Sequence, residues 1–452
     1  MRWGVGVLAT ACLLAGVVTA PAHAARALPA DRFTNSVGVN THVMFHDTPY
    51  KDLDATLTAL QWLGVRQVRD GVSAPPPPRG TWYRREQHRR FVALSRAGVR
   101  LDLIVGGPDQ DGDTLDARIG LIRAIPGVRS VEGPNEWDRN GGDGWAATLP
   151  DLQRRLDAAI DADPILQVRG VEVVGPSFGT LENAAQVGDL SDAFDLGNLH
   201  SYSGGRQPEQ AEVQGAQALP DRLKLIRGLN GSRPTVITET GFHNADRSNR
   251  MPATPEDVAA VYTLRTVLEN ARLGVRRTYL YELFDSYSDP IDVNAEAQFG
   301  LFDHDRQPKP AAAALRALLR ATRDGGASPA GRTLAVKATG AEDLRMLVLA
   351  KSRGRFAVVV WRAVPLYDPD LRQDLEVGEQ EVTVALGKRF GAVRARRPAE
   401  LDDPQERWSD TDTVKLGVGG APVVLELTPG PGGSGLPSAA GKTEIRVKLP
   451  FL

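Results

Sequence analysis

The alternation of apolar and polar positions divides the chain into two parts. From residue 33 to about residue 323, short β-branched apolar runs alternate with longer segments in which apolar residues recur every three or four positions. This alternation is typical of repeated βα units. The predicted strands are the runs at 36–40, 65–70, 99–107, 128–133, 171–176, 195–200, 235–240 and 277–282.

The number of these runs predicts the fold class. Eight runs between residues 36 and 282 match the strand count of a (β/α)₈ barrel, which typically needs roughly 250 residues. A doubly wound open sheet would have fewer strands and a Gly-rich phosphate loop after the first one. The segment SVGVNTHV contains no such loop. We therefore predict an α/β fold with a (β/α)₈ TIM barrel over residues 25–325.

The helix after the seventh run has the clearest local signals. Thr254 and Pro255 supply a candidate capping hydroxyl and a proline for the first turn, and Gly274 follows the apolar pattern. These residues predict where the helix starts and where it stops.

The pattern changes after residue 325, where glycine and proline become frequent. Short apolar runs broken by turn residues then follow, which predicts a C-terminal β-sandwich domain over residues 326–452. The Gly/Pro-rich segment near 429–441 is expected to be a flexible loop or linker, and TEIRVKLPFL a possible last strand.

The first 24 residues are typical of a secretory signal peptide. Arg2 precedes an apolar run over 4–18, and Ala22-His23-Ala24 forms a small-x-small cleavage site. The run is shorter than the roughly 20 apolar residues that a membrane-spanning helix needs. We expect cleavage near Ala24 and a secreted protein, located outside the cell or in its envelope. Cys12, the single cysteine, lies in this segment, so the mature chain has no cysteine nucleophile and no disulfide.

Charge and composition narrow the range of partners. The net charge is -2, with acidic and basic residues interspersed, so there is no basic stripe for nucleic acid and no polybasic anchor for a membrane. The segment DQDGD at 109–113 is similar to a calcium loop, but Gly120 stands where that loop needs a glutamate. We expect no metal and no cofactor. The oligomeric state is not readable from the sequence.

Polar residues follow most of the predicted strands, and in a barrel the C-terminal strand ends carry the functional groups. Glu136 ends the fourth strand and Glu239 the seventh, so the two carboxylates should face each other across the barrel mouth. Cleavage of a glycosidic bond requires such an opposed pair. The other candidates at strand ends are Asn40, His42, Arg69, Asp70, Asn135, His200, Tyr202, Tyr281 and Glu282.

Three motifs carry a family resemblance: Asn135-Glu136 after the fourth strand, His200-Ser201-Tyr202 after the sixth, and Glu239 after the seventh. Their order resembles the clan of retaining (β/α)₈ glycoside hydrolases that includes families 5, 39 and 51, with family 39 the nearest. The resemblance covers residues 33–323, and many members also carry a trailing β-sandwich. It implies a carbohydrate substrate and double displacement, with Glu136 as acid/base and Glu239 as nucleophile.

The resemblance also implies roles for neighbouring residues. Asn135 would donate a hydrogen bond to the sugar 2-hydroxyl, and Arg69 would donate to Glu239. The Tyr202 hydroxyl would lie near Glu239. The remaining predicted substrate-binding residues are His200, His42, Asn40, Trp137, Tyr281 and Glu282.

Several of these residues have a structural alternative. Arg69 and Asp70 could form a salt bridge that seals the barrel end, His200 could be a core histidine with its hydrogen bonds satisfied, and Trp137 and Trp145 could stack on sugar or simply pack. Arg206, Arg247 and Arg250 could favour an anionic sugar or lie on the solvated surface.

The eighth strand departs from the clan, because many members end it with a tryptophan. Tyr281 or Phe284 must take that place here. Glu282 is an extra acid that could bind a sugar hydroxyl, pair with an arginine, or face away.

Two other functions use the same residues. A lectin-like barrel would bind glycan without cleaving it, and a transglycosylase would transfer the sugar to another sugar. The sequence leaves the sugar, the linkage and the mode of attack open.

Overall fold

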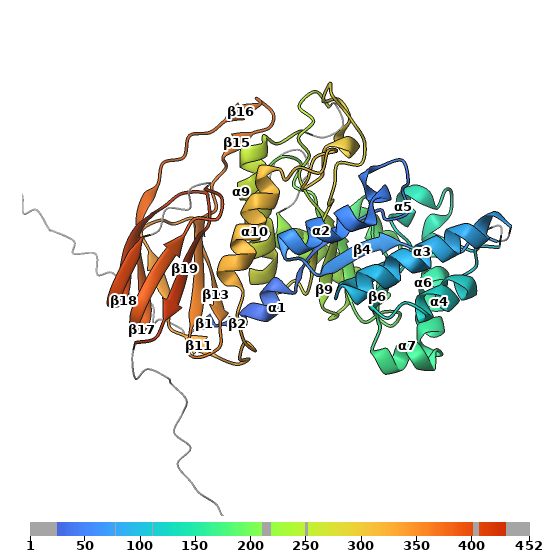
Figure 1. Cartoon of the computed structure of the whole chain (residues 1–452), viewed down its shortest axis with the longest axis horizontal. Helices are drawn as coiled ribbons and strands as arrows, with labels where there is room; N and C mark the ends of the chain where they lie inside the picture. Colours follow the sequence, from blue (N-terminus) through green and yellow to red (C-terminus); the bar gives the residue numbers. More distant parts are fainter. Residues whose placement is uncertain are drawn as a thin grey trace, which may run out of the picture.

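The structure is a computed structural model that describes residues 25–76, 78–110, 112–209, 218–248, 252–400 and 406–430. The predicted signal peptide, most of the Gly/Pro-rich segment and TEIRVKLPFL lie outside these ranges. Figure 1 shows a barrel with its surrounding helices on the right and a β-rich part on the left.

Eight parallel strands form the barrel, in the order β7-β6-β5-β4-β3-β10-β9-β8. A parallel bridge between Val174 and Leu196 connects the first and last strands of this order, so the sheet is nearly closed. Each strand lies within a predicted run, except that β4 extends one residue beyond its run, and the TIM barrel is confirmed. The bounds are β3 Val37–Asn40, β4 Gln67–Gly71, β5 Arg100–Ile104, β6 Val128–Glu132, β7 Glu172–Val174, β8 Gly197–His200, β9 Thr235–Thr240 and β10 Thr278–Leu280.

Helices follow the strands and cover the outside of the barrel (Figure 1). None of the helices in the described ranges is long and apolar enough to cross a membrane. The α-helices are α1 Ala30–Thr34, α2 Leu53–Leu63, α3 Arg79–Arg96, α4 Leu115–Arg123, α5 Trp137–Asn140, α6 Trp145–Asp161, α7 Pro164–Arg169, α8 Leu219–Asn230, α9 Glu256–Arg272 and α10 Pro310–Thr322. Short 3₁₀ turns are η1 Pro49–Lys51, η2 Leu181–Gln186 and η3 Ala295–Ala297.

The predicted start of α9 needs a correction. Pro255, with an extended ψ of 146°, is the N-cap residue, and no side chain caps the helix. Thr254 therefore precedes the N-cap and is one residue too far out for its hydroxyl to reach the first free N–H groups. The predicted stop is correct, since Gly274 follows the helix with a left-handed φ of 84°.

The C-terminal part is a β-sandwich built from one strongly bent, mainly antiparallel sheet. Its order is β12-β17-β19-β14-β13-β2, and β18 pairs with β17, whose register shifts between Ala385 and Phe390. The bounds are β1 Ala25–Arg26, β2 Leu28–Pro29, β11 Thr333–Leu334, β12 Lys337–Thr339, β13 Leu344–Ala350, β14 Phe356–Arg362, β15 Tyr367–Asp368, β16 Gln373–Asp374, β17 Gln380–Arg396, β18 Arg407–Val418 and β19 Val423–Thr428.

The two faces of this sheet have different neighbours, because side chains alternate along a strand. Val358 and Val360 of β14 belong to the core of the sandwich. Val359 and Trp361 belong to the large core that also holds the barrel and α10. The sandwich therefore packs against the barrel. The first described residues join it too, since β1 pairs with β11 and β2 pairs with β13.

Candidate functional site

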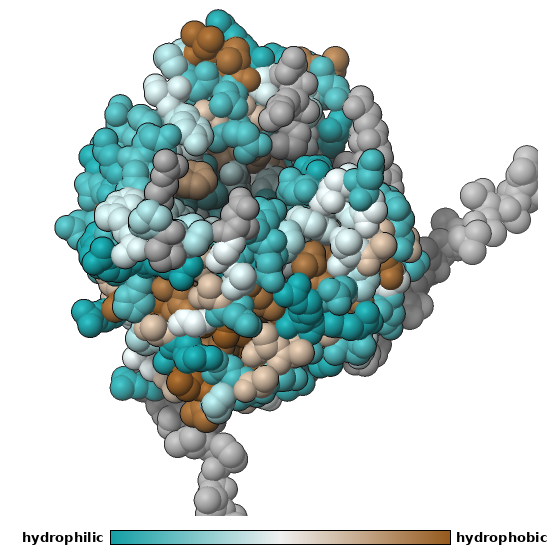
Figure 2. Space-filling model, turned by 90° about the vertical axis from the view of Figure 1, so that its right-hand side faces the viewer, coloured by the Kyte–Doolittle hydropathy of each residue, from teal (hydrophilic) through white to brown (hydrophobic). Residues whose placement is uncertain are grey.

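A cavity of about 720 Å³ lies at the C-terminal ends of the barrel strands. The face in Figure 2 has a hollow bordered mainly by hydrophilic residues. Most of the predicted site residues line the cavity, although they are distributed between residues 40 and 281 of the sequence. They are Asn40, His42, Arg69, Asp70, Asn135, Glu136, His200, Tyr202, Glu239 and Tyr281.

Glu136 stands at a sharp turn between β6 and α5. Its backbone is left-handed, with φ 44° and ψ 50°, and its N–H donates to the Ser177 hydroxyl over 3.0 Å. A residue with a side chain is strained in this conformation, and such strain tends to persist where function requires it. The turn directs the Glu136 carboxylate into the cavity, where Oε1 lies 2.9 Å from His200 Nδ1 and Oε2 accepts from Arg139 over 3.3 Å.

Glu239 lies near the end of β9, and both of its oxygens accept hydrogen bonds. Arg69 Nη1 donates to Oε1 over 2.6 Å, and the Tyr202 hydroxyl donates to Oε2 over 2.9 Å. Burial alone would raise the pKa of Glu239, but the charges of His200 and Arg69, together with these hydrogen bonds, outweigh it and lower the pKa. Glu239 is therefore held as a carboxylate.

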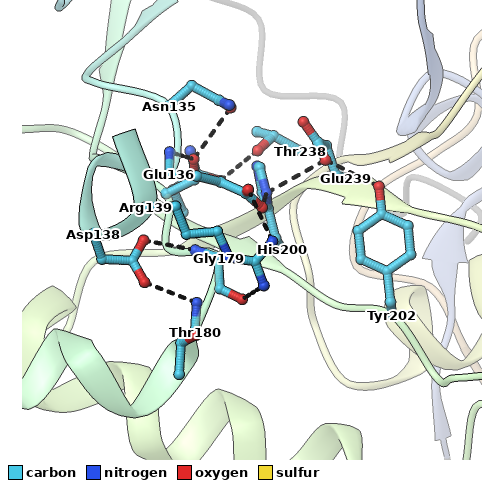
Figure 3. A network of polar contacts seen from close by, with 12 residues as sticks. Asn135, Glu136, Asp138, Arg139, Gly179, Thr180, His200, Tyr202, Thr238 and Glu239 are labelled. Atoms are coloured by element: carbon cyan, nitrogen blue, oxygen red, sulfur yellow. Dashed lines mark hydrogen bonds and ion pairs between the residues drawn. The ribbon is translucent and has the colours of Figure 1, made fainter. Parts of the chain in front are cut away.

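His200 bridges the two acids. Its Nδ1 lies 2.9 Å from Glu136 Oε1 and 3.4 Å from Glu239 Oε2 (Figure 3). The three atoms all lie within 4.8 Å of one another. Retaining glycosidases place their carboxyl groups about 5–5.5 Å apart, and inverting ones about 6.5–9.5 Å. The spacing seen here fits the retaining arrangement.

The same three side chains could also hold a metal ion. Glu239, however, already has the Arg69 guanidinium on one oxygen and the Tyr202 hydroxyl on the other. A cation at this point would be repelled by the charge of Arg69. The hydrogen-bonding pattern favours an acid pair over a metal site.

Arg69 organises the floor of the cavity. It is 2% exposed and donates to both oxygens of Glu132, over 2.7 and 2.9 Å. It also donates to the amide oxygens of Asn40, over 3.0 Å, and Asn135, over 2.6 Å. Burial opposes the charge of Arg69, but Glu132 and Glu239 outweigh this effect and raise its pKa. Because Asn135 Oδ1 is occupied in this way, its amide N–H groups are left to face the cavity.

The alternative salt bridge between Arg69 and Asp70 is not formed. Neighbouring residues on a strand point to opposite faces, and Asp70 instead accepts from the Thr41 hydroxyl over 2.7 Å and from the Val43 N–H over 3.0 Å. Burial raises the pKa of Asp70 to about 7.

His200 is not a core histidine with its hydrogen bonds satisfied. Its Nε2 is buried, and no group in the described ranges bonds to it. Its Nδ1 lies within 3.4 Å of a carboxylate oxygen of Glu136 and of Glu239, so His200 is bound to the acid pair and not to the core.

Glu282 lies beneath the cavity and does not line it, which corrects the prediction for this residue. It is fully buried and accepts from the Tyr50 hydroxyl over 3.0 Å and from the Ser286 hydroxyl over 3.0 Å. His42 Nε2 lies 3.3 Å away. Burial raises the pKa of Glu282 to about 8 and lowers that of His42 to about 4. Glu282 therefore faces away from the cavity and supports His42 as a neutral partner.

Trp137 also lies outside the cavity lining, a second correction. Its indole N–H donates to the Thr148 hydroxyl over 3.0 Å, and its ring packs on the barrel core. The turn that brings Glu136 inward carries the next side chain outward. Trp145 packs edge-on against Phe178. At the eighth strand, Tyr281 lines the cavity, whereas Phe284 is fully buried.

Arg206 fits neither alternative, because it does not line the cavity and its side chain, paired with Asp370 in the C-terminal part, is only 13% exposed. Arg247 is not among the residues that line the cavity. Arg250 lies outside the described ranges.

Sequence reasoning missed several charged residues of the site, among them Glu132, Arg139 and Arg222, and also Glu182 and Glu296 in the cavity lining. Glu132 is a charged residue at the end of the apolar strand β6. A buried charge in that position could have been recognised from the sequence as a candidate partner for Arg69. Arg139 binds Glu136, and its other amino group donates to the Gly179 carbonyl (Figure 3). Arg222 reaches the cavity from α8, where it donates to the Ser201 hydroxyl over 2.9 Å. Nothing in the local sequence distinguishes these arginines from others.

Comparison with known proteins supports the fold. No family model matches the chain, and no curated protein matches it. Among solved structures, a family 39 glycoside hydrolase from Bacteroides cellulosilyticus is 16% identical, with a TM-score of 0.59 over 89% of this chain and 82% of the other. The chain has the fold of family 39 glycoside hydrolases.

Two further family 39 structures extend this result. A family 39 enzyme from Xanthomonas axonopodis is 18% identical, with a TM-score of 0.57 over 89% of this chain and 96% of the other. A monomeric β-xylosidase from Caulobacter crescentus is 16% identical, with a TM-score of 0.55 over 90% and 98%. The similarity spans both the barrel and the sandwich of this chain.

Proposed function

We propose that the protein is a retaining glycoside hydrolase that cleaves an oligosaccharide or polysaccharide. The observation that carries the proposal is the pair of carboxylates, Glu136 and Glu239, which meet around His200 with one oxygen of each within 4.8 Å of the other. The fold shared with family 39 glycoside hydrolases supports it.

In the first step, Glu239 attacks the anomeric carbon and the bond to the leaving oxygen breaks. Glu136 gives its proton to that oxygen, so the leaving group departs as a neutral alcohol and a glycosyl ester forms on Glu239. The environment of Glu239 suits this role, because Arg69 and Tyr202 keep it ionised.

In the second step, Glu136 takes a proton from a water molecule, whose oxygen attacks the anomeric carbon. The ester bond breaks and Glu239 returns as a carboxylate. Two inversions give net retention. The Asn135 amide would hold the 2-hydroxyl, an interaction that contributes most in the transition state.

We also propose that the protein is exported. The support is the signal-like segment of the first 24 residues. An exported hydrolase would meet glycans of the cell surroundings, which directs the choice of substrates for the test.

The test is sugar release from a panel of bacterial and plant cell-wall polysaccharides and aryl glycosides, including aryl β-xyloside. Wild type is compared with Glu239→Gln, which keeps the shape of the side chain and removes its charge. We expect release by wild type only, with a product of retained anomeric configuration in NMR spectra. Release by both proteins would refute the assignment of Glu239. Binding without release by wild type would favour the lectin-like function, and new glycosidic bonds in the product would favour transglycosylation.

A further inference from the structure

Two aromatic side chains next to the cavity are exposed to solvent. Phe45, after β3, is 43% exposed, and Trp82, in the first turn of α3, is 56% exposed. Large apolar side chains exposed together often mark a binding surface. The aromatic strip is defined here as Phe45, His46 and Trp82.

The strip continues directly from the cavity. Phe45 itself lines the cavity and stacks on His42, with ring centroids 4.7 Å apart and an interplanar angle of 13°. The next residue, His46, contacts Trp82 with centroids 5.1 Å apart. Tyr83, beside Trp82, lines the cavity as well. One surface therefore runs from the acid pair outward over the loops that follow β3 and β4.

The rings of the strip are held in place before any ligand binds. His42 fixes one face of Phe45, and Glu282 in turn contacts His42 Nε2 over 3.3 Å. An aromatic ring held in this way loses little conformational freedom on binding. Its free face matches the apolar C–H face of a pyranose ring, and the sugar hydroxyls stay in water at the edges.

The position of the strip indicates which part of a substrate it would meet. The strip lies over the loops that follow β3 and β4. Arg139 and Arg222 line the opposite side of the cavity, from the helices that follow β6 and β8, and Arg139 donates directly to the proton donor Glu136. The leaving group belongs beside the proton donor. A chain that continues beyond the cleaved sugar in the other direction passes over Phe45 and Trp82.

We propose that the aromatic strip is a second sugar-binding subsite, on the non-reducing side of the cleaved bond. The inference rests on the proposed hydrolase function and deepens it: the substrate is a glycan chain with at least one sugar beyond the one that reacts with Glu239. An enzyme of this kind cleaves within a chain or releases a unit longer than one sugar.

Binding is tested without catalysis, in the Glu239→Gln background. Electrophoresis through gels containing arabinoxylan, mixed-linkage β-glucan, glucomannan or arabinogalactan measures affinity by retardation. We expect retardation in at least one gel and affinity about tenfold weaker after Trp82→Ala or Phe45→Ala. The matched control is Ile165→Ala, an exposed apolar residue of α7, which should leave the affinity unchanged.

A second measurement uses the active enzyme and aryl glycosides of one and two sugars, in the sugar that the panel identifies. Trp82→Ala should lower the ratio of kcat/KM for the disaccharide to that for the monosaccharide by about tenfold. Unfolding midpoints equal to wild type exclude a folding defect. An unchanged ratio in both strip variants, or no retardation in any gel, overturns the subsite. If wild type shows no turnover, the proposed hydrolase function is overturned. The gel-retardation result then decides by itself whether the aromatic strip binds sugar.

Discussion

Arg69 donates a hydrogen bond to Oε1 of Glu239 over 2.6 Å, although 170 residues separate the two in sequence. Arg69 is buried and also pairs with Glu132. This one guanidinium therefore neutralises a structural acid below the cavity and keeps the proposed nucleophile ionised.

Replacement of Arg69 tests this double role. Arg69→Met removes the positive charge that compensates the buried carboxylates of Glu132 and Glu239, and we expect a loss of about 3–5 kcal/mol in the free energy of unfolding. Chemical denaturation measures it. A loss below about 1 kcal/mol would contradict a central role for the pair, and Arg389→Met, which removes an exposed ion pair with Asp410, is the control.

Tyr202→Phe removes only the hydroxyl that donates to Glu239 Oε2. The pKa of Glu239 is lowered in part by this bond, so it should rise in the variant. Activity requires the ionised form and is lost as the pH falls through this pKa. The acid limb of kcat/KM should therefore shift to higher pH, with a drop in rate of about 10- to 100-fold.

The pH–rate profile of each tyrosine variant measures this effect. Tyr287→Phe removes a hydroxyl from an exposed tyrosine outside the cavity lining and serves as the control. An acid limb at the wild-type position in Tyr202→Phe would show that the bond does not tune Glu239.

Glu136→Ala should lower the rate of both steps, because the proton donor and the base are the same group. Azide needs no general base to attack the glycosyl ester, so it should restore part of the turnover of an aryl glycoside with a good leaving group. The product should be a glycosyl azide of retained configuration, seen by NMR. Neither rescue nor azide product would mean that Glu136 has another role.

Glu282→Gln tests the buried acid beneath His42. Burial raises the pKa of Glu282 to about 8 in the folded protein, above its ordinary value of 4.5. Between these two pH values the folded protein keeps a proton on Glu282 that the unfolded chain has lost. Stability from this group is fully present below about pH 4.5 and declines as the pH rises toward 8.

Glutamine cannot titrate, so the decline in unfolding free energy from pH 5 to pH 7.5 should be shallower in Glu282→Gln by up to about 1.4 kcal/mol per pH unit. Denaturation at several pH values measures the slopes. Asp70, whose pKa is raised to about 7, contributes the same decline in unfolding free energy to wild type and to Glu282→Gln. It therefore does not affect the difference between the two slopes. Equal slopes would show that Glu282 is ionised in the folded protein.

The sequence determined the barrel and the positions of its acids because these depend on local patterns. Short β-branched apolar runs such as TVITET, and the turn residues that end them, define a strand without reference to the rest of the chain. Glu136 and Glu239 follow the fourth and seventh runs, and strand order alone puts such ends at one mouth.

Tertiary structure decided the contacts that depend on side-chain direction and distant partners. Trp137 and Glu282 each follow a proposed site residue directly, yet the turn after β6 carries Trp137 outward and the end of β10 buries Glu282 below the floor. Arg69 could have paired with its neighbour Asp70, but strand alternation turns it toward Glu132 and Glu239. Likewise, β2 pairs with β13 across more than 300 residues. Residue spacing along the chain determines local conformation. The directions of these side chains and the pairing of β2 instead depend on the free energy of burying charges and strand edges against groups that are distant in sequence.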